Sequence, residues 1–277
     1  MFGNKASKGA SAVVTGAGSG IGAAFAHELA RRGGRVVCSD IRLDTAEATA
    51  NAILRAGGSA HAVACDVSDI DQVDFLAAAA EEWLRCPPDL VVNNAGVGIG
   101  GRAIGEIPLG DWQWTVGVNM WGVIHGCHVF APKLKAQGKG GIINVCSAAS
   151  FAAAPLMGPY NVTKAAVLAL SETLAAELAG TGVTVTALCP TWVKTNIARD
   201  GRIPEGTGRI AQKMMDLTGL SAESVARTTL NAFDKGQLYV LPQVDARLVW
   251  RMKRLAPASY ARGAGLVGRW LKSTADA

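Results

Sequence analysis

The sequence predicts an α/β fold in which a doubly wound, parallel, seven-stranded β-sheet carries helices on both faces. Short runs rich in β-branched residues and bounded by glycine alternate with longer Ala- and Leu-rich runs of helical period. A glycine-rich turn joins the first predicted strand directly to the first predicted helix. The 277 residues are 49% hydrophobic, which is enough for one large core in a single domain.

The elements follow one another as a parallel sheet requires. We expect strands over residues 12–15, 35–39, 60–65, 90–93, 141–146, 183–188 and 237–241. We expect helices near residues 20–32, 44–56, 69–85, 111–136, 158–179 and 221–234. Ligands of such sheets bind beyond the carboxyl ends of the strands, so the residues that follow each strand are the candidates for function.

The net charge of +5 lies entirely in the last 33 residues and divides the chain in two. Residues 1–244 carry 20 basic and 20 acidic side chains, whereas residues 245–277 carry 7 basic and 2 acidic ones. We therefore expect a cofactor-binding and catalytic body over 1–244 and a basic amphipathic extension over 245–277. The balanced body gives no indication of a nucleic-acid partner.

The extension has two clusters of apolar residues. The first repeats at helical spacing beside basic residues and the second follows it: Leu248, Val249, Met252 and Leu255, then Leu266, Val267, Trp270 and Leu271. We expect these apolar faces to dock on the same subunit or on a neighbour. Contact with an anionic membrane surface is the less favoured alternative.

Six dispersed cysteines form no C-x-x-C pair and have no histidine cluster nearby. They predict reduced thiols, no metal site and a cytoplasmic protein. No apolar stretch approaches the ~18 residues of a spanning helix, and the first residues lack the apolar stretch of a signal peptide.

The turn after the first strand reads Thr15-Gly16-Ala17-Gly18-Ser19-Gly20-Ile21-Gly22. Glycines let the backbone turn tightly, and a helix amino terminus offers N–H groups and a positive dipole to phosphates. The turn therefore indicates a pyrophosphate site, the alternative being a glycine turn that only packs a helix on a strand.

Asp40 stands at the end of the second strand, 20 residues after Gly20. A carboxylate there accepts hydrogen bonds from an adenosine ribose and repels a 2′-phosphate, which favours NAD over NADP. The alternatives are that Asp40 only caps the next helix, or that Arg42 accommodates a 2′-phosphate.

The spacing Thr15-Gly16-x-x-x-Gly20-x-Gly22 resembles the dinucleotide fingerprint of the classical short-chain dehydrogenase/reductase family. Further landmarks of that family follow in its order over about residues 11–241: Asp66, Asn93-Asn94-Ala95-Gly96, Asn119, Ser147 and Tyr160-Asn161-Val162-Thr163-Lys164. The resemblance implies a Rossmann fold and an enzyme that moves a hydride between a nicotinamide cofactor and an alcohol/carbonyl pair.

The resemblance also implies a set of cofactor-binding residues: Gly16, Ser19, Gly20, Ile21, Asp40, Ile41, Asp66, Val67, Asn94, Ala95, Gly96, Tyr160, Lys164, Pro190, Val193 and Thr195. NADP-preferring members often have a basic residue where this chain has Ser19 or Ile41, which again favours NAD. One departure is Thr191, where many members have glycine, and it leaves the local loop shape open.

Tyr160 and Lys164 stand at i and i+4, which places both on one face of a helix. We expect the ammonium to lower the pKa of the phenol toward neutrality, so that Tyr160 acts as general acid/base. Ser147, after the fifth strand, is expected to hold the substrate oxygen. In the resemblance, Lys164 also holds the nicotinamide ribose, and Asn119 bends its helix and holds a water that relays protons. The predicted catalytic set is Asn119, Ser147, Tyr160 and Lys164.

Segments 98–102, 148–157 and 196–219 and Trp192 border the predicted nicotinamide site. We expect 196–219 to be a mobile lid with Met214, Met215 and Leu217 on its apolar side. The predicted substrate residues are Ser147, Phe151, Met157, Tyr160 and Trp192. Their apolar character favours a bulky hydrophobic secondary alcohol or ketone of steroid, terpenoid, aryl or fatty-acyl type, although these side chains would serve equally to pack the lid.

Two other functions are consistent with the sequence: an NADPH-dependent 3-oxoacyl-thioester reductase, and a cofactor-binding regulator without turnover. The family resemblance further implies that the helices near 111–136 and 158–179 pair across a two-fold axis, giving a homodimer or homotetramer.

Overall fold

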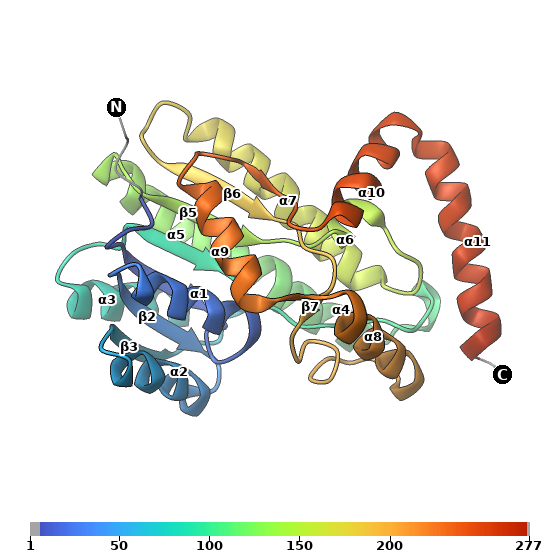
Figure 1. Cartoon of the computed structure of the whole chain (residues 1–277), viewed down its shortest axis with the longest axis horizontal. Coiled ribbons are helices and arrows are strands. Elements are labelled where there is room, and N and C mark those ends of the chain that lie inside the picture. The colour runs from blue at the N-terminus through green and yellow to red at the C-terminus, as the bar shows by residue number, and fades with distance from the viewer. Residues whose placement is uncertain (1–5, 276–277) are drawn as a thin grey trace.

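The computed structural model describes residues 6–275 and contains the predicted seven-stranded parallel sheet (Figure 1). The strand order is β3-β2-β1-β4-β5-β6-β9. Successive strands are added on one side of β1 up to β3 and on its other side from β4 onward, as in a Rossmann fold. The strands are β1 (Ser11–Thr15), β2 (Arg35–Asp40), β3 (Ser59–Ala64), β4 (Leu90–Asn93), β5 (Gly141–Val145), β6 (Thr184–Leu188) and β9 (Tyr239–Val240).

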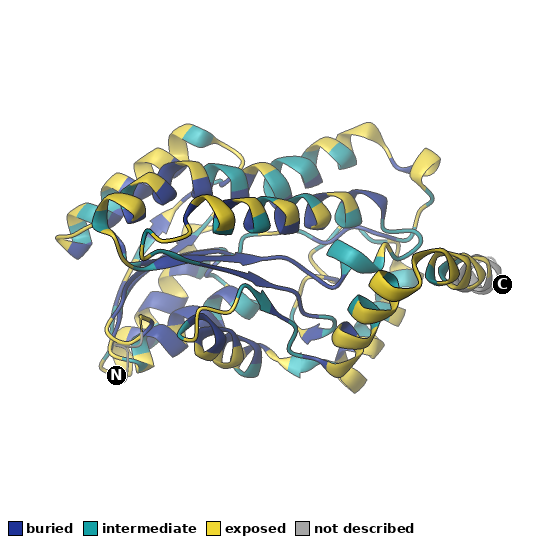
Figure 2. Ribbon diagram, turned by 90° about the horizontal axis from the view of Figure 1, so that it is seen from above, coloured by how far each residue is buried: buried dark blue, intermediate teal, exposed yellow. Residues whose placement is uncertain are grey.

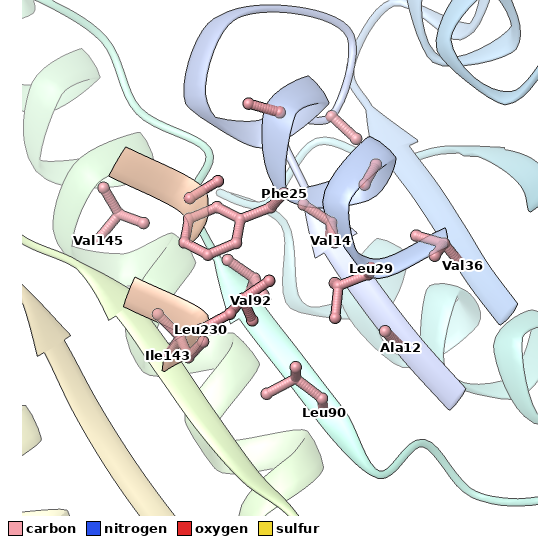
Figure 3. Packing of buried hydrophobic residues seen from close by; sticks show 14 of the residues in the cluster. Ala12, Val14, Phe25, Leu29, Val36, Leu90, Val92, Ile143, Val145 and Leu230 are labelled. Atoms are coloured by element: carbon pink, nitrogen blue, oxygen red, sulfur yellow. The ribbon is translucent and has the colours of Figure 1, made fainter. Parts of the chain in front are cut away.

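The sheet is covered on both faces because successive strand residues point to opposite sides. Val14 belongs to a core with α1 (Gly20–Arg31), α2 (Leu43–Arg55) and α9 (Ala222–Phe233), as Figure 3 shows for Phe25, Leu29 and Leu230. Its neighbour Val13 belongs to the second core, with α3 (Ile70–Leu84), α5 (Gly122–Gln137) and α7 (Gly158–Glu177). Figure 2 shows the buried strands between these two helical layers.

The helix expected near 111–136 is interrupted. It consists of α4 (Leu109–Val116), a π-helical turn η2 (Gly117–Trp121) and α5. A short 3₁₀ turn, η1 (Ile104–Glu106), precedes it. The hydrophobic period alone does not reveal the π turn, because the apolar pattern continues through it.

The segment between β6 and α9 contains more regular structure than expected. β7 (Val193–Lys194) pairs in parallel with β8 (Leu220–Ser221), and the predicted lid contains α8 (Glu205–Thr218). Met215 is buried, but Met214 and Leu217 are exposed. The prediction that all three lie on an apolar inner side is therefore wrong for two of them.

The C-terminal extension forms α10 (Val244–Leu255) and α11 (Pro257–Ala275), and α10 packs beside the short α6 (Ala149–Ala152). Ala246 is the buried residue of α10 and Val249 is half-buried, whereas Leu248, Met252 and Leu255 are exposed, so three of the four residues of the first apolar cluster do not face the body as expected. Leu266 is also exposed, and the side chains of Val267, Trp270 and Leu271 lie outside the described residues.

Within residues 6–275, no helix combines the length and the apolar character that crossing a bilayer requires. All six cysteines are free thiols, and only Cys86 is exposed.

Candidate active site

The glycine turn between β1 and α1 is shaped by close backbone approaches. Gly16 and Gly20 adopt left-handed φ angles of 63° and 53°, which favour glycine. A Cβ on Gly22 would overlap the Gly16 carbonyl oxygen. The Asn94 amide donates to the carbonyl oxygens of Thr15 (2.8 Å) and Gly16 (3.1 Å), so the end of β4 fixes the turn.

Asp40 lies against the same turn. Its Oδ2 accepts from the Gly18 N–H (2.9 Å) and its Oδ1 from the Arg42 N–H (3.1 Å). Arg42, not Asp40, is the N-cap residue of α2, so the capping alternative for Asp40 is wrong. Ile41 is exposed beside it.

Asp66 and Val67 follow β3, beside the π turn. Asp66 Oδ1 accepts from the Ser68 N–H (2.9 Å) and hydroxyl (2.7 Å), and the Val67 carbonyl oxygen is 2.9 Å from His125 Nδ1. A Cβ on Gly122 would lie 2.5 Å from Val67 Cγ2, so α5 and this segment pack closely.

Asn119 is fully buried within the π turn. Its Oδ1 accepts from the Val97 N–H (2.7 Å) and its Nδ2 donates to the Val97 carbonyl oxygen (2.9 Å). A Cβ on Gly96 would lie 3.2 Å from Asn119 Oδ1 and 3.5 Å from Lys164 Nζ. Gly96 therefore lets Asn119 and Lys164 approach the same point.

Lys164 and Tyr160 occupy successive turns at the start of α7. Lys164 is buried, and its Nζ donates to the Val145 carbonyl oxygen (2.8 Å) and lies 5.8 Å from the centroid of the Tyr160 ring. Ser147, two residues after Val145, accepts from the Ala149 N–H at its Oγ (3.2 Å). Tyr160, Lys164 and Ser147 are thus brought to one place at the carboxyl end of β5.

The pKa of Tyr160 is shifted upward, not downward as predicted. Burial raises the pKa of the Tyr160 phenol, and the hydrogen bond with Ser147 opposes this only in part. Burial also lowers the pKa of Lys164, which disfavours the ammonium that was expected to act on the phenol. Both shifts follow from desolvation, which the i, i+4 spacing does not report.

The predicted cofactor residues after β6 lie near the glycine turn, since Thr195 approaches Gly20. Pro190 accepts from the Ala148 N–H at its carbonyl (2.8 Å), and Val193 is buried in the first core. A Cβ on Gly20 would lie 3.1 Å from Thr195 Cγ2. A cavity of about 490 Å³ adjoins Gly20, Thr195 and its two neighbours, and α1 and the start of α9 form the rest of its lining. The left-handed glycines and the carboxylate at the end of β2 fit a dinucleotide.

The predicted substrate residues are not equivalent. Phe151 belongs to α6 and packs against the second core. Its side chain therefore serves in part to hold α6 in place. Met157 and Trp192 are half-buried on loops, and the backbone of Met157 bridges to Arg102. Sequence analysis missed two residues that hold these loops, Gln243 and Tyr260, because their partners lie 51 or more positions away.

The chain belongs to the short-chain dehydrogenase family, whose model matches residues 10–205. The crystal structure of a short-chain dehydrogenase/reductase from Burkholderia phymatum in complex with NAD superposes with a TM-score of 0.83 at 37% identity, over 88% of this chain and 92% of that one.

Two curated relatives are similar over most of this chain. The probable oxidoreductase EphD of Mycobacterium tuberculosis is 37% identical over 256 residues, which are 88% of this chain but only 43% of EphD. The chain thus spans less than half the length of that relative. The 1-deoxy-11-beta-hydroxypentalenate dehydrogenase of Streptomyces exfoliatus is 34% identical, over 90% of this chain and 91% of the relative.

Proposed function

We propose that this protein is an NAD-dependent dehydrogenase that interconverts a secondary alcohol and a ketone on a bulky hydrophobic skeleton of steroid, terpenoid, aryl or fatty-acyl type. The observation that carries the proposal is the convergence of Ser147, Tyr160 and Lys164 at the carboxyl end of β5, with Asn119 behind Gly96. The substrate class is supported by the half-buried Met157 and Trp192 and by the relative named for a hydroxypentalenate.

The side chains divide the chemistry. A bound nicotinamide would supply the hydride acceptor for alcohol oxidation and the hydride donor for ketone reduction. Tyr160 removes the hydroxyl proton during oxidation and returns it during reduction. Ser147 holds the substrate oxygen beside the phenol, and Lys164 supplies positive charge when protonated. Asn119, which lies in the π turn, positions a water that relays protons to Lys164.

NAD is proposed over NADP because the Asp40 carboxylate lies at the end of β2, where a 2′-phosphate would meet negative charge. The solved relative with NAD bound agrees with this choice. We further propose that Gly16, Ser19, Gly20 and Ile21 hold the pyrophosphate at the start of α1, that Asp66 and Val67 border the adenine, and that Asn94, Ala95, Pro190, Val193 and Thr195 line the rest of the groove.

The test is a screen of hydrophobic secondary alcohols with NAD and, separately, with NADP, following absorbance of the reduced cofactor. We expect turnover with NAD and a clear preference for it over NADP. Efficient reduction of 3-oxoacyl thioesters with NADPH would instead establish the reductase alternative. Cofactor binding without turnover of any substrate would indicate a regulator.

We also propose a homodimer or homotetramer built on α4, α5 and α7. These helices pack together, yet Leu109 of α4, Trp121 of the π turn η2 and Val162 of α7 are exposed. Such residues favour an isologous contact. Light scattering at micromolar concentration tests this, and a monomeric mass would contradict it.

A further inference from the structure

Gln243 uses its side chain in an unusual way for a residue at the start of a helix. It is the N-cap residue of α10, but its amide does not cap the helix. Instead, its Oε1 accepts from the Thr191 N–H (3.2 Å) and its Nε2 donates to the Trp192 carbonyl oxygen (2.8 Å). One buried amide thus binds two consecutive residues of the segment after β6.

A second contact joins the same two segments. The Thr191 hydroxyl donates to Asp245 Oδ1 (3.1 Å), which also accepts from the Ala246 N–H (2.8 Å). Many family members have glycine at the position of Thr191, but Thr191 here has no left-handed backbone that would require it. The first turn of α10 therefore accepts one hydrogen bond, from the Thr191 hydroxyl, that a glycine at position 191 could not donate.

The support of Gln243 is firmly attached to the body. The Trp250 ring of α10 lies 6.0 Å from the Tyr239 ring of β9, and the Arg254 guanidinium stacks on Trp250 at 3.8 Å. The Tyr239 hydroxyl in turn donates to Glu172 of α7 (2.6 Å). α10 is thus anchored to β9 and α7, and it presents Gln243 from a fixed position.

The segment that Gln243 holds is central to the proposed cofactor site. It follows Pro190, whose carbonyl accepts from Ala148 next to Ser147, and it leads directly into Val193 and Thr195. The Trp192 carbonyl also accepts from the Leu220 N–H (3.1 Å), so the segment is held from the β8 side as well. A change in the orientation of residues 191–192 would therefore shift Val193 and Thr195 on the proposed cofactor side and the region of Ser147 on the proposed substrate side.

We propose that Gln243 is a positioning residue that preorganises Thr191 and Trp192 for binding of the nicotinamide dinucleotide, which makes the start of α10 part of the active site. This inference rests on the proposed function, because the ligand concerned is NAD. It adds to that function a structural link between the start of α10 and the segment that follows β6.

The primary test replaces Gln243 by leucine, which has a similar volume and no hydrogen-bonding groups. We expect faster hydrogen–deuterium exchange at the Thr191 amide and a Kd for NAD, measured by calorimetry, that is weaker by about tenfold, because two neutral hydrogen bonds are lost. The matched control is Gln137→Leu, which removes another amide donor to a backbone carbonyl, that of Pro88, at the far end of α5. The control is expected to leave both quantities unchanged.

Gln243→Glu provides a second test with a readout that a merely structural role would not change. Its carboxylate keeps the acceptor for Thr191 but lacks a donor for Trp192, whereas the protonated carboxyl regains one. We expect NAD binding to this variant to strengthen as the pH falls from 7 toward 5, relative to the unchanged protein. Leucine and glutamate variants that bind NAD like the unchanged protein at pH 7 would overturn the inference.

The two proposals fail in distinguishable ways. If the unchanged protein does not bind NAD, the proposed function is overturned, and with it the role of Gln243 toward that ligand. If the unchanged protein binds NAD and Gln243→Leu alters neither the Kd nor the exchange at Thr191, only the positioning role is overturned.

Discussion

The two sides of the catalytic crevice are constructed in different ways. The proposed pyrophosphate turn on the cofactor side is one continuous run, Thr15 to Gly22, with Asn94 and Asp40 bonded to its backbone. Its shape follows from glycines that adopt left-handed φ angles or allow close approach. A single local pattern therefore defines this turn.

The substrate side is assembled from segments far apart in the sequence. The Gly101 N–H donates to the Leu156 carbonyl (2.8 Å), and Arg202 binds the Gly98 carbonyl through its N–H (2.9 Å) and Asp111 through its side chain (2.6 Å). Tyr260 of α11 donates to the Ala152 carbonyl (2.9 Å). The comparison teaches that the glycine turn is set by local backbone geometry, whereas the substrate side, like the segment after β6, depends on long-range contacts.

The largest effect is expected where the two sides meet. Tyr160→Phe removes the dissociable proton and should reduce kcat by roughly 10²–10⁴-fold, the usual range for general acid–base catalysis. NAD binding should remain nearly unchanged, because the phenyl ring preserves the packing. Steady-state kinetics and calorimetry on one preparation separate these quantities, and a variant with most of its activity left would refute the assignment of Tyr160.

The raised pKa of Tyr160 predicts the sign of the pH dependence. Oxidation needs the phenolate, so below this pKa the rate of alcohol oxidation should rise about tenfold per pH unit. Ketone reduction needs the phenol and should lose rate only as the pH passes above the pKa. Rate profiles measured in both directions check this, and an oxidation rate that is flat across neutral pH would contradict it.

A smaller effect is expected from the cofactor side alone. Asp40→Ala removes the proposed partner of the ribose and its bond to Gly18, and should reduce the preference for NAD over NADP by about tenfold, since one carboxylate contact is typically worth ~1.5–3 kcal/mol. The control is Asp44→Ala, which removes an exposed carboxylate from the first turn of α2. Equal preference ratios in the two variants would show that Asp40 does not select the cofactor.

The smallest effect is expected from the substrate side. Tyr260→Phe removes one hydroxyl donor to Ala152 and should raise the substrate KM several-fold with little change in the Kd for NAD, as expected for a contact worth ~0.5–1.5 kcal/mol. Thr181→Val removes a comparable hydroxyl donor to a carbonyl, that of Leu178, and should leave the KM unchanged. If Tyr260→Phe instead weakened NAD binding alone, the division between the two sides would be wrong.

The sequence by itself determined the fold class, the glycine turn and the pairing of Tyr160 with Lys164. Each of these depends on short-range spacing: strand alternation, helical period, or residues four positions apart on a helix. The same reasoning placed the functional residues at the carboxyl ends of the strands, because a parallel sheet brings those ends together.

Only the tertiary structure decided how these residues are held. The partner of Lys164 Nζ is a backbone carbonyl of β5, and the pKa of Tyr160 rises because burial, which no spacing reports, disfavours the phenolate. The bonds of Gln243 to residues 191 and 192 join segments about 50 positions apart, and α10 docks beside α6, which is still farther away in the sequence. Such contacts follow from how whole elements pack against each other, and a local pattern carries no information about which distant residue will lie opposite.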